Sequence, residues 1–329
     1  MSALAPVMEA FFTERLLAQR RASPHTVASY RDTFRLLLGF AHRRIGKTPA
    51  KLALEDLDAV VIGAFLDHLE RERHNSVRTR NNRLAAIHSL FAYAALRHPE
   101  HAALIARVLA IPAKRMNRRL ICFLTDDEVD ALLAVPDRDT WVGRRDHALL
   151  LVAVQTGMRV SELTSLTCGD VELGTGAHLR CHGKGRKERI TPLTNQVCAV
   201  LRVWLTERRG APGEVVFPSR RGGPLSSDAV AVLVTRHARA AMRWCPSLGT
   251  KTVTPHVLRH TCAMRLLAVG VDTSVIALWL GHEGVETTQI YLHADLAIKE
   301  RALARTAPTG TTPGRYRPPD ALLAFLEGL

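Results

Sequence analysis

The first third of the chain places apolar residues at helical spacing and carries clear helix-start signals. From Val7 to Arg20 the apolar side chains recur three to four positions apart, as one buried helix face requires. Ser23-Pro24 supplies an N-cap and a first-turn proline for a helix that ends near Arg44. Further helical patterns cover residues 55–72 and 76–96. We therefore expect residues 5–110 to be entirely helical.

The rest of the chain combines helical patterns with one short pair of strands. Leu124-Thr-Asp-Asp-Glu128 has the spacing of a capping box and predicts a helix start. The predicted helices lie at about 125–134, 141–156, 160–166, 194–209, 226–244, 255–269, 273–280 and 286–292. Strands at about 177–181 and 187–192 flank Gly183-Lys-Gly185, which predicts a hairpin turn.

Two segments lack these periodicities. Residues 111–121 are strongly basic and typical of a linker that lies along a polyanion. Residues 307–319 are rich in Pro, Gly and Thr and predict a flexible strap. Beyond the strap, one short helix has an apolar face formed by Leu322, Leu323, Phe325, Leu326 and Leu329. So short a helix needs a surface to pack against, on its own domain or on a neighbouring protomer.

Charge and composition narrow the class of partner. The 329 residues carry a net charge of +14, and residues 1–119 hold 20 Lys and Arg against 10 Asp and Glu. This excess favours nucleic acid. No apolar run is long enough to span a membrane, and no secretory signal is evident. The six cysteines are scattered without C-x-x-C spacing, so we expect reduced thiols in a cytoplasmic protein.

The candidate chemistry lies in the second half. Arg159 occurs in Thr156-Gly-Met-Arg-Val-Ser-Glu162, and Lys184 in His182-Gly-Lys-Gly-Arg-Lys187. His256 and Arg259 share one face of a predicted helix, and Tyr291 follows His282 by nine residues. Several fixed donors beside one phenol suit attack on a phosphodiester, because the donors hold a doubly charged phosphorane while the tyrosine supplies the nucleophile.

A metal site is the weaker interpretation. His260 lies four residues after His256, but no H-E-x-x-H motif is present and a third ligand is lacking. We expect His260 to be a packed or capping residue, and we predict no metal and no cofactor.

These motifs, in this order, resemble the tyrosine recombinase (phage integrase) family, and in particular its Xer-like two-domain members. The similarity is strong over residues 120–306 and weaker over 5–110. The matching segments are a T-G-x-R-x-x-E-L box from Thr156 to Leu163, a G-K-G-x-K hairpin with Lys184, an H-x-L-R-H box from His256 to His260, L-G-H ending at His282, and T-x-x-I-Y ending at Tyr291. All six active-site positions of the family are filled by the expected residue types.

The resemblance implies a mainly α fold that forms a C-shaped DNA clamp. The implied parts are a helical N-terminal core-binding (SAM-like) domain at 1–110, a basic linker at 111–121, an α-rich catalytic domain with a small antiparallel β-hairpin or sheet at 122–306, and a C-terminal strap and exchange helix at 307–329. No arm-type domain is expected before residue 5.

The resemblance also implies the chemistry and the partners. Tyr291 forms a 3′-phosphotyrosyl bond, and Lys184 protonates the 5′-oxygen that leaves. Arg159, Arg259 and His282 bind the phosphate. His256 or His282 could assist Tyr291 in losing its proton, or the positive charge of the site could lower the pKa of the phenol. Glu162, three residues after Arg159, could orient a neighbouring arginine or cap a loop. The implied partners are double-stranded DNA with inverted-repeat core sites and a homotetramer, alone or with related recombinases, in the nucleoid of a prokaryote and with no membrane involved.

Basic residues outside the six form the predicted DNA-binding set. Ser76 to Arg83 brings several phosphate-binding side chains to one helix start, although a solvated helix end would have the same sequence. The set comprises Arg78, Arg80, Arg83, Lys114, Arg115, Arg118, Arg119, Arg186 and Lys187.

Three functions are compatible with these residues. The first is a site-specific recombinase acting in integration, excision, resolution or transposition. The second is a type IB-like topoisomerase, which uses the same chemistry on one duplex. The third is a catalytically silent DNA-binding or architectural protein, against which the complete set of six residues argues.

Overall fold

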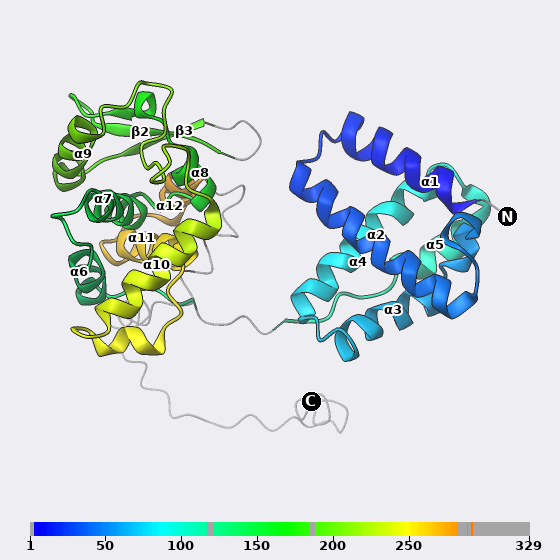
Figure 1. Cartoon of the computed structure of the whole chain (residues 1–329). Coiled ribbons are helices and arrows are strands. Elements are labelled where there is room, and N and C mark those ends of the chain that lie inside the picture. The colour runs from blue at the N-terminus through cyan, green and yellow to red at the C-terminus, as the bar shows by residue number, and fades with distance from the viewer. Residues whose placement is uncertain (1–2, 117–120, 184–187, 282–287, 289–290, 292–329) are drawn as a thin grey trace, which may run out of the picture. The chain divides into compact units, whose positions relative to one another are not determined.

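The computed structural model describes residues 3–116, 121–183 and 188–281, together with Thr288 and Tyr291. These residues form two compact units, Met1–Arg118 and Arg119–Leu329 (Figure 1). Of the residues predicted to act, Lys184, Arg186, Lys187, His282, Arg118 and Arg119 lie outside the described ones, as do the strap and the terminal helix.

The N-terminal unit is helical throughout its described part, as predicted. Its helices are α1 Leu4–Ala10, a π-helix Phe11–Gln19, α2 Pro24–Ile45, α3 Ala59–Arg71, α4 Val77–Ala95 and α5 Ala102–Leu109, with short 3-10 turns at Pro49–Lys51, Leu54–Asp56 and Pro99–His101. The helix predicted from Val7 to Arg20 is thus divided at Phe11. Ser23 caps α2 by accepting from the Thr26 N–H, which confirms the predicted start.

A cluster of aromatic rings packs in the core of this unit. Phe11 is fully buried and contacts the rings of Tyr30, Phe34 and Tyr93. These rings come from three helices far apart in the sequence, so their packing holds α2 and α4 against the π-helix.

The C-terminal unit is built around α7, which is buried along almost its whole length. Helices α6, α9 and α11 pack against it, as Figure 1 shows. The helices are α6 Asp126–Ala134, α7 Trp141–Thr156, α8 Val160–Ser165, α9 Asn195–Arg208, α10 Ser227–Ala241, α11 Pro255–Ala268 and α12 Thr273–Leu280, with 3-10 turns at Cys168–Asp170 and Pro246–Thr250. The capping box predicted at Thr125 and Glu128 is confirmed.

A small antiparallel sheet flanks these helices. The strands β1 Val171–Glu172, β2 His178–His182 and β3 Glu188–Pro192 pair in that order. The β2–β3 hairpin was predicted, whereas the two-residue β1 was not. Across the hairpin His182 pairs with Glu188 and Cys181 pairs with Arg189, so Arg189 lies one pair away from the turn.

Two glycines end α7 and α12 in the left-handed conformation. Gly157 has φ +62° and Gly281 has φ +65°. A Cβ on Gly157 would lie 2.5 Å from Leu280 Cδ2, so the two helix ends approach each other more closely than any side chain at position 157 would permit. This close approach places the residues around 157 beside those around 280.

The described part of the chain lacks membrane-spanning helices and disulfides. No helix there is long and apolar enough to cross a membrane. All six cysteines are described, and none forms a disulfide.

Candidate active site

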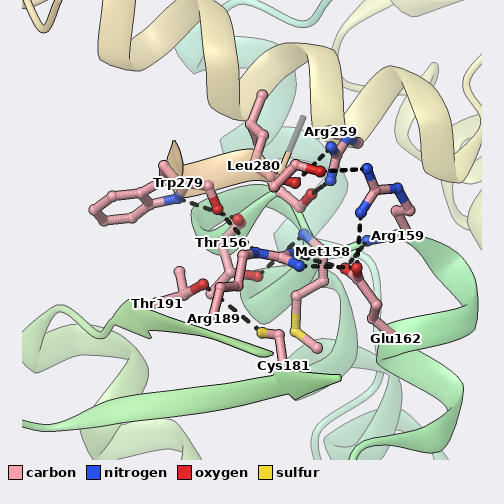
Figure 2. Close-up of polar contacts among 12 residues, drawn as sticks. Thr156, Met158, Arg159, Glu162, Cys181, Arg189, Thr191, Arg259, Trp279 and Leu280 are labelled. Atoms are coloured by element: carbon pink, nitrogen blue, oxygen red, sulfur yellow. Dashed lines mark hydrogen bonds and ion pairs between the residues drawn. The ribbon is translucent and has the colours of Figure 1, made fainter. Parts of the chain in front are cut away.

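The C-terminal end of α12 presents three consecutive backbone carbonyls, and a different arginine donates to each. Arg189 Nε lies 3.0 Å from Trp279 O, Arg259 Nη2 lies 2.7 Å from Leu280 O, and Arg159 Nη2 lies 2.6 Å from Gly281 O (Figure 2). The last carbonyls of a helix have no partner within it and carry its negative dipole end. The arginines supply both hydrogen bonds and positive charge there, immediately before position 282.

One buried carboxylate joins two of these arginines. Glu162 Oε1 accepts from Arg159 Nη1 at 2.9 Å and from Arg189 Nη1 at 2.8 Å. Its Oε2 accepts from Arg189 Nη2 and from the Arg159 backbone N–H, both at 2.8 Å. Burial raises the pKa of Glu162, but the bonds from Arg189 and Arg159 outweigh it and lower the pKa below its ordinary value. Glu162 therefore stays ionised and fixes both guanidinium groups.

Arg259 joins the ends of α7 and α12 from α11. Its Nη1 donates to Gly157 O at 2.6 Å, in addition to the bond to Leu280 O, and its side chain is buried. Burial, with the nearby charge of Arg159, lowers the pKa of Arg259 to about 10. The guanidinium is still protonated at neutral pH, so the site keeps its cation.

Tyr291 is buried against α11, with a relative exposure of 1%. Its Oη lies 3.1 Å from Nδ1 of His260, whose ring meets that of His256 edge-on with centroids 4.2 Å apart. Burial raises the pKa of the Tyr291 phenol to about 12, against the opposing effect of Arg259. The phenol is therefore neutral and hydrogen-bonded at neutral pH.

The structure thus brings most of the predicted set into one neighbourhood. Arg159 and Arg259 meet at the end of α12. Glu162 orients a neighbouring arginine, one of the two roles considered for it, and its carboxylate also caps the start of α8. His256 is exposed, and its ring contacts that of His260, which in turn contacts Tyr291. Lys184 and His282 belong to the segments outside the described residues, and their roles stay predictions.

Sequence reasoning missed two residues of this neighbourhood. His260 was expected to pack or cap, yet it contacts the nucleophile candidate. Its position four residues after His256 was the available signal, because residues at this spacing share a helix face. Arg189 was not singled out, because its strand reverses the usual pattern. Apolar Ile190 lies on the outer face and is 63% exposed, whereas the arginine lies on the inner face.

The basic residues of the N-terminal unit differ from one another. Arg78 and Arg115 are exposed, and Arg83 is partly buried. Arg80 is only 6% exposed, and its Nη1 donates to Pro112 O at 3.0 Å. The structure therefore argues against the predicted phosphate contact of Arg80, because its side chain holds the chain segment that leaves the unit.

Lys114 is held to the same segment. The Asn81 side chain bonds the Lys114 carbonyl at 2.8 Å and its N–H at 3.1 Å, and Lys114 Nζ lies 2.6 Å from Glu70. Its charge is thus partly balanced before any DNA binds.

Metal ligands do not gather in the described part of the chain. No group of three or more His, Cys, Asp or Glu side chains there is arranged to hold an ion.

Comparison with known proteins identifies the family. Residues 122–297 match the phage integrase family, and residues 10–98 match the N-terminal SAM-like domain of phage integrases. The chain belongs to the phage integrase family. It is 59% identical over 328 residues to a Sinorhizobium fredii protein named as integrase/recombinase y4rC, with 100% of this chain and 99% of that one covered.

More distant relatives support the same family assignment. Tyrosine recombinase XerC of Pelobacter propionicus is 32% identical, with 94% of this chain and 99% of that one covered. The crystal structure of the XerH recombinase bound to DNA shares the fold with a TM-score of 0.70 at 24% identity, covering 87% of this chain and 81% of that one. The chain is therefore a tyrosine recombinase, an enzyme that breaks and rejoins DNA strands, and the predicted fold class is confirmed.

Proposed function

We propose that Tyr291 is the nucleophile of a site-specific recombination reaction in which Arg159 and Arg259 bind the scissile phosphate. The observation that carries this proposal is the convergence of both arginines on the end of α12, with Tyr291 buried against α11, the helix that carries Arg259. A guanidinium fixed by carbonyl bonds needs little reorganisation when phosphate charge develops beside it.

The strand-breaking step transfers one bond. Tyr291 Oη attacks the phosphorus, the bond to the 5′-oxygen breaks, and a 3′-phosphotyrosyl link remains. Lys184 gives a proton to the leaving 5′-oxygen. A 5′-hydroxyl of the partner duplex then attacks the link and releases the tyrosine. Because the link conserves the energy of the broken bond, the cycle needs no ATP.

The phenol also has to release its proton, and His260 is the proposed first acceptor. His260 Nδ1 already lies within hydrogen-bond distance of Tyr291 Oη, and the exposed His256 adjoins the same ring. We assign this step to His260 rather than to His256 or His282. A positioned base contributes roughly 10²–10⁴-fold to a rate.

The proposed partners follow from charge and from the relatives. The basic N-terminal unit, with Arg78, Arg83 and Arg115, would bind phosphates on the duplex. The XerH structure contains a palindromic DNA substrate, which supports inverted-repeat sites here. We propose that four copies assemble on two such sites.

The test is covalent trapping on a nicked suicide substrate. Tyr291→Phe should bind DNA but form no covalent complex, whereas Tyr93→Phe should react normally. Tyr93 is a fair control because it is also buried, and its phenol donates to Glu14 at 3.2 Å in the other unit. A stable adduct with Tyr291→Phe would assign the nucleophile elsewhere. Strand exchange between two sites would separate a recombinase from a topoisomerase.

A further inference from the structure

Arg189 connects three segments of the site that are far apart in the sequence. It lies on β3, bonds both oxygens of Glu162 on α8, and bonds Trp279 O on α12. Its side chain is 11% exposed, although arginine is among the residues least often buried. Figure 2 shows the guanidinium between Glu162 and Trp279.

A second observation shows that the surrounding backbone is shaped for this side chain. A Cβ on Gly281 would lie 3.2 Å from both Cδ and Nη1 of Arg189, a tighter contact than side chains normally make. The left-handed glycine that ends α12 therefore leaves room for Arg189 as well as turning the chain toward position 282.

Because Arg189 lies near the start of strand β3, its contacts fix the hairpin close to Lys184 in the sequence. Arg189 pairs with Cys181, and the last pair of the ladder is His182–Glu188, between which the chain continues through residues 183–187, including Lys184. The hairpin is thus fixed to α8 and α12 close to its tip. A lysine with a flexible side chain needs such a rigid support, because a displacement of about 1 Å at a reacting group can cost about 10²-fold in rate.

We infer that Arg189 is a positioning residue that holds the Lys184 hairpin in register with Arg159 and with the end of α12. It does not touch DNA in this scheme. It acts through Lys184, so the inference rests on the proposed role of Lys184 as the acid that protonates the 5′-oxygen.

The competing explanation is a purely structural ion pair. Arg189 and Glu162 are both buried, and breaking such a pair destabilises a protein whatever its function. A second alternative is that Arg189 serves Arg159 through their shared carboxylate, and thereby phosphate binding rather than proton transfer. The test has to separate these alternatives.

The experiment compares two leaving groups. Full-length Arg189→Lys keeps the charge but loses the two-pronged donor that spans Glu162. First-strand cleavage is measured on a nicked suicide substrate with a normal 5′-oxygen and on one with bridging 5′-sulfur, which leaves without a proton. We expect cleavage on oxygen to fall about 10–100-fold, and most of this loss to be absent on sulfur.

Three comparisons make the result decisive. Lys184→Ala should show the same recovery on sulfur, and if it does not, the proposed role of Lys184 fails. Recovery for Lys184→Ala with equal loss on both substrates for Arg189→Lys would overturn only the inference about Arg189. Arg180→Lys, an exposed arginine on β2 that donates to Gly169 O, should cleave both substrates like the wild type.

Folding is followed in the same series. If Arg189→Lys does not give a folded protein, Arg189→Gln is used, since it removes the charge and retains N–H donors. Addition of guanidinium ion to Arg189→Ala gives a third measurement. Recovery on sulfur in whichever variant folds supports the inference, and an undiminished rate on oxygen contradicts it.

Discussion

The two units both gather arginines around a helix end, but they use them differently. In the C-terminal unit Arg159, Arg189 and Arg259 all donate to carbonyls at the end of α12. In the N-terminal unit, the arginines near the start of α4 range from the exposed Arg78 to the buried Arg80. Charge alone predicts a polyanionic partner, whereas burial decides which arginine can reach it.

The largest expected effect concerns the two carboxylates that accompany these arginines. Glu162→Ala removes the counter-charge of the nearly buried Arg189 and of the partly exposed Arg159. Breaking a buried pair such as Arg189–Glu162 typically costs about 3–5 kcal/mol of stability. Glu70→Ala removes the partner of Lys114, which is half exposed, and should cost about 1 kcal/mol or less. Thermal unfolding of both variants measures the contrast.

Similar losses for the two variants would show that the difference in burial does not matter here. Glu162→Gln sharpens the result, because it keeps the shape and the acceptor oxygen but removes the charge. It should fall between wild type and Glu162→Ala in stability.

The next effect concerns one partly buried, hydrogen-bonded histidine in each unit. His260→Gln keeps a polar side chain near Tyr291 but cannot take its proton, so the rate of covalent-complex formation should fall by about 10²-fold or more. His88→Gln, which alters a bond to Val108 O in the N-terminal unit, should leave that rate unchanged. Single-turnover cleavage on a suicide substrate measures both.

A faster rate for His260→Gln would assign the opposite role to the contact. His260 would then restrain the tyrosine in its buried position instead of accepting its proton.

A smaller effect concerns pH. The pKa of Tyr291 is raised from 10.0 to about 12 in the folded protein, because burial disfavours the phenolate. The stability associated with this neutral phenol is fully present below pH 10 and is lost as pH rises toward 12, by about 2–3 kcal/mol in all. Unfolding of the wild type and of Tyr291→Phe, compared from pH 9 upward, should show the wild type losing stability relative to the variant. Parallel profiles would mean that the phenol is not buried in solution.

The smallest effect concerns α4 and DNA. Arg78→Ala should lower the slope of log affinity against log salt by about 0.9 without changing stability, since each lost phosphate contact removes about one released counterion. Arg80→Met should lower stability and leave the salt slope unchanged, because it removes the bond to Pro112 O. Equal salt slopes for wild type and Arg78→Ala would make this face ordinary solvated surface.

Local signals in the sequence were sufficient for most of the fold. Caps at Ser23 and Thr125 gave helix starts to within about a residue, because capping is a contact between near neighbours. The two-residue β1 was missed because its pairing with β2 is its main determinant. The division at Phe11 was likewise not visible in a continuous helical pattern.

The site was predictable in its residue types but not in its internal connections. Arg159, Arg259 and Tyr291 stand in motifs with fixed spacing, so their proximity could be inferred. The inward orientation of Arg189 depends on the strand register, and the burial of Arg80 depends on Pro112, 32 residues further along. Neither property is encoded in adjacent residues.

The three arginines and one glutamate around the end of α12 also set a charge balance. Together Arg159, Arg189, Arg259 and Glu162 carry a surplus of two positive charges. An intact phosphodiester brings one negative charge, whereas the five-coordinate phosphorus that forms when Tyr291 attacks brings two. In the proposed reaction, this positive cluster therefore attracts the five-coordinate phosphorus more strongly than it attracts the intact phosphodiester, and so favours the transition state over resting DNA.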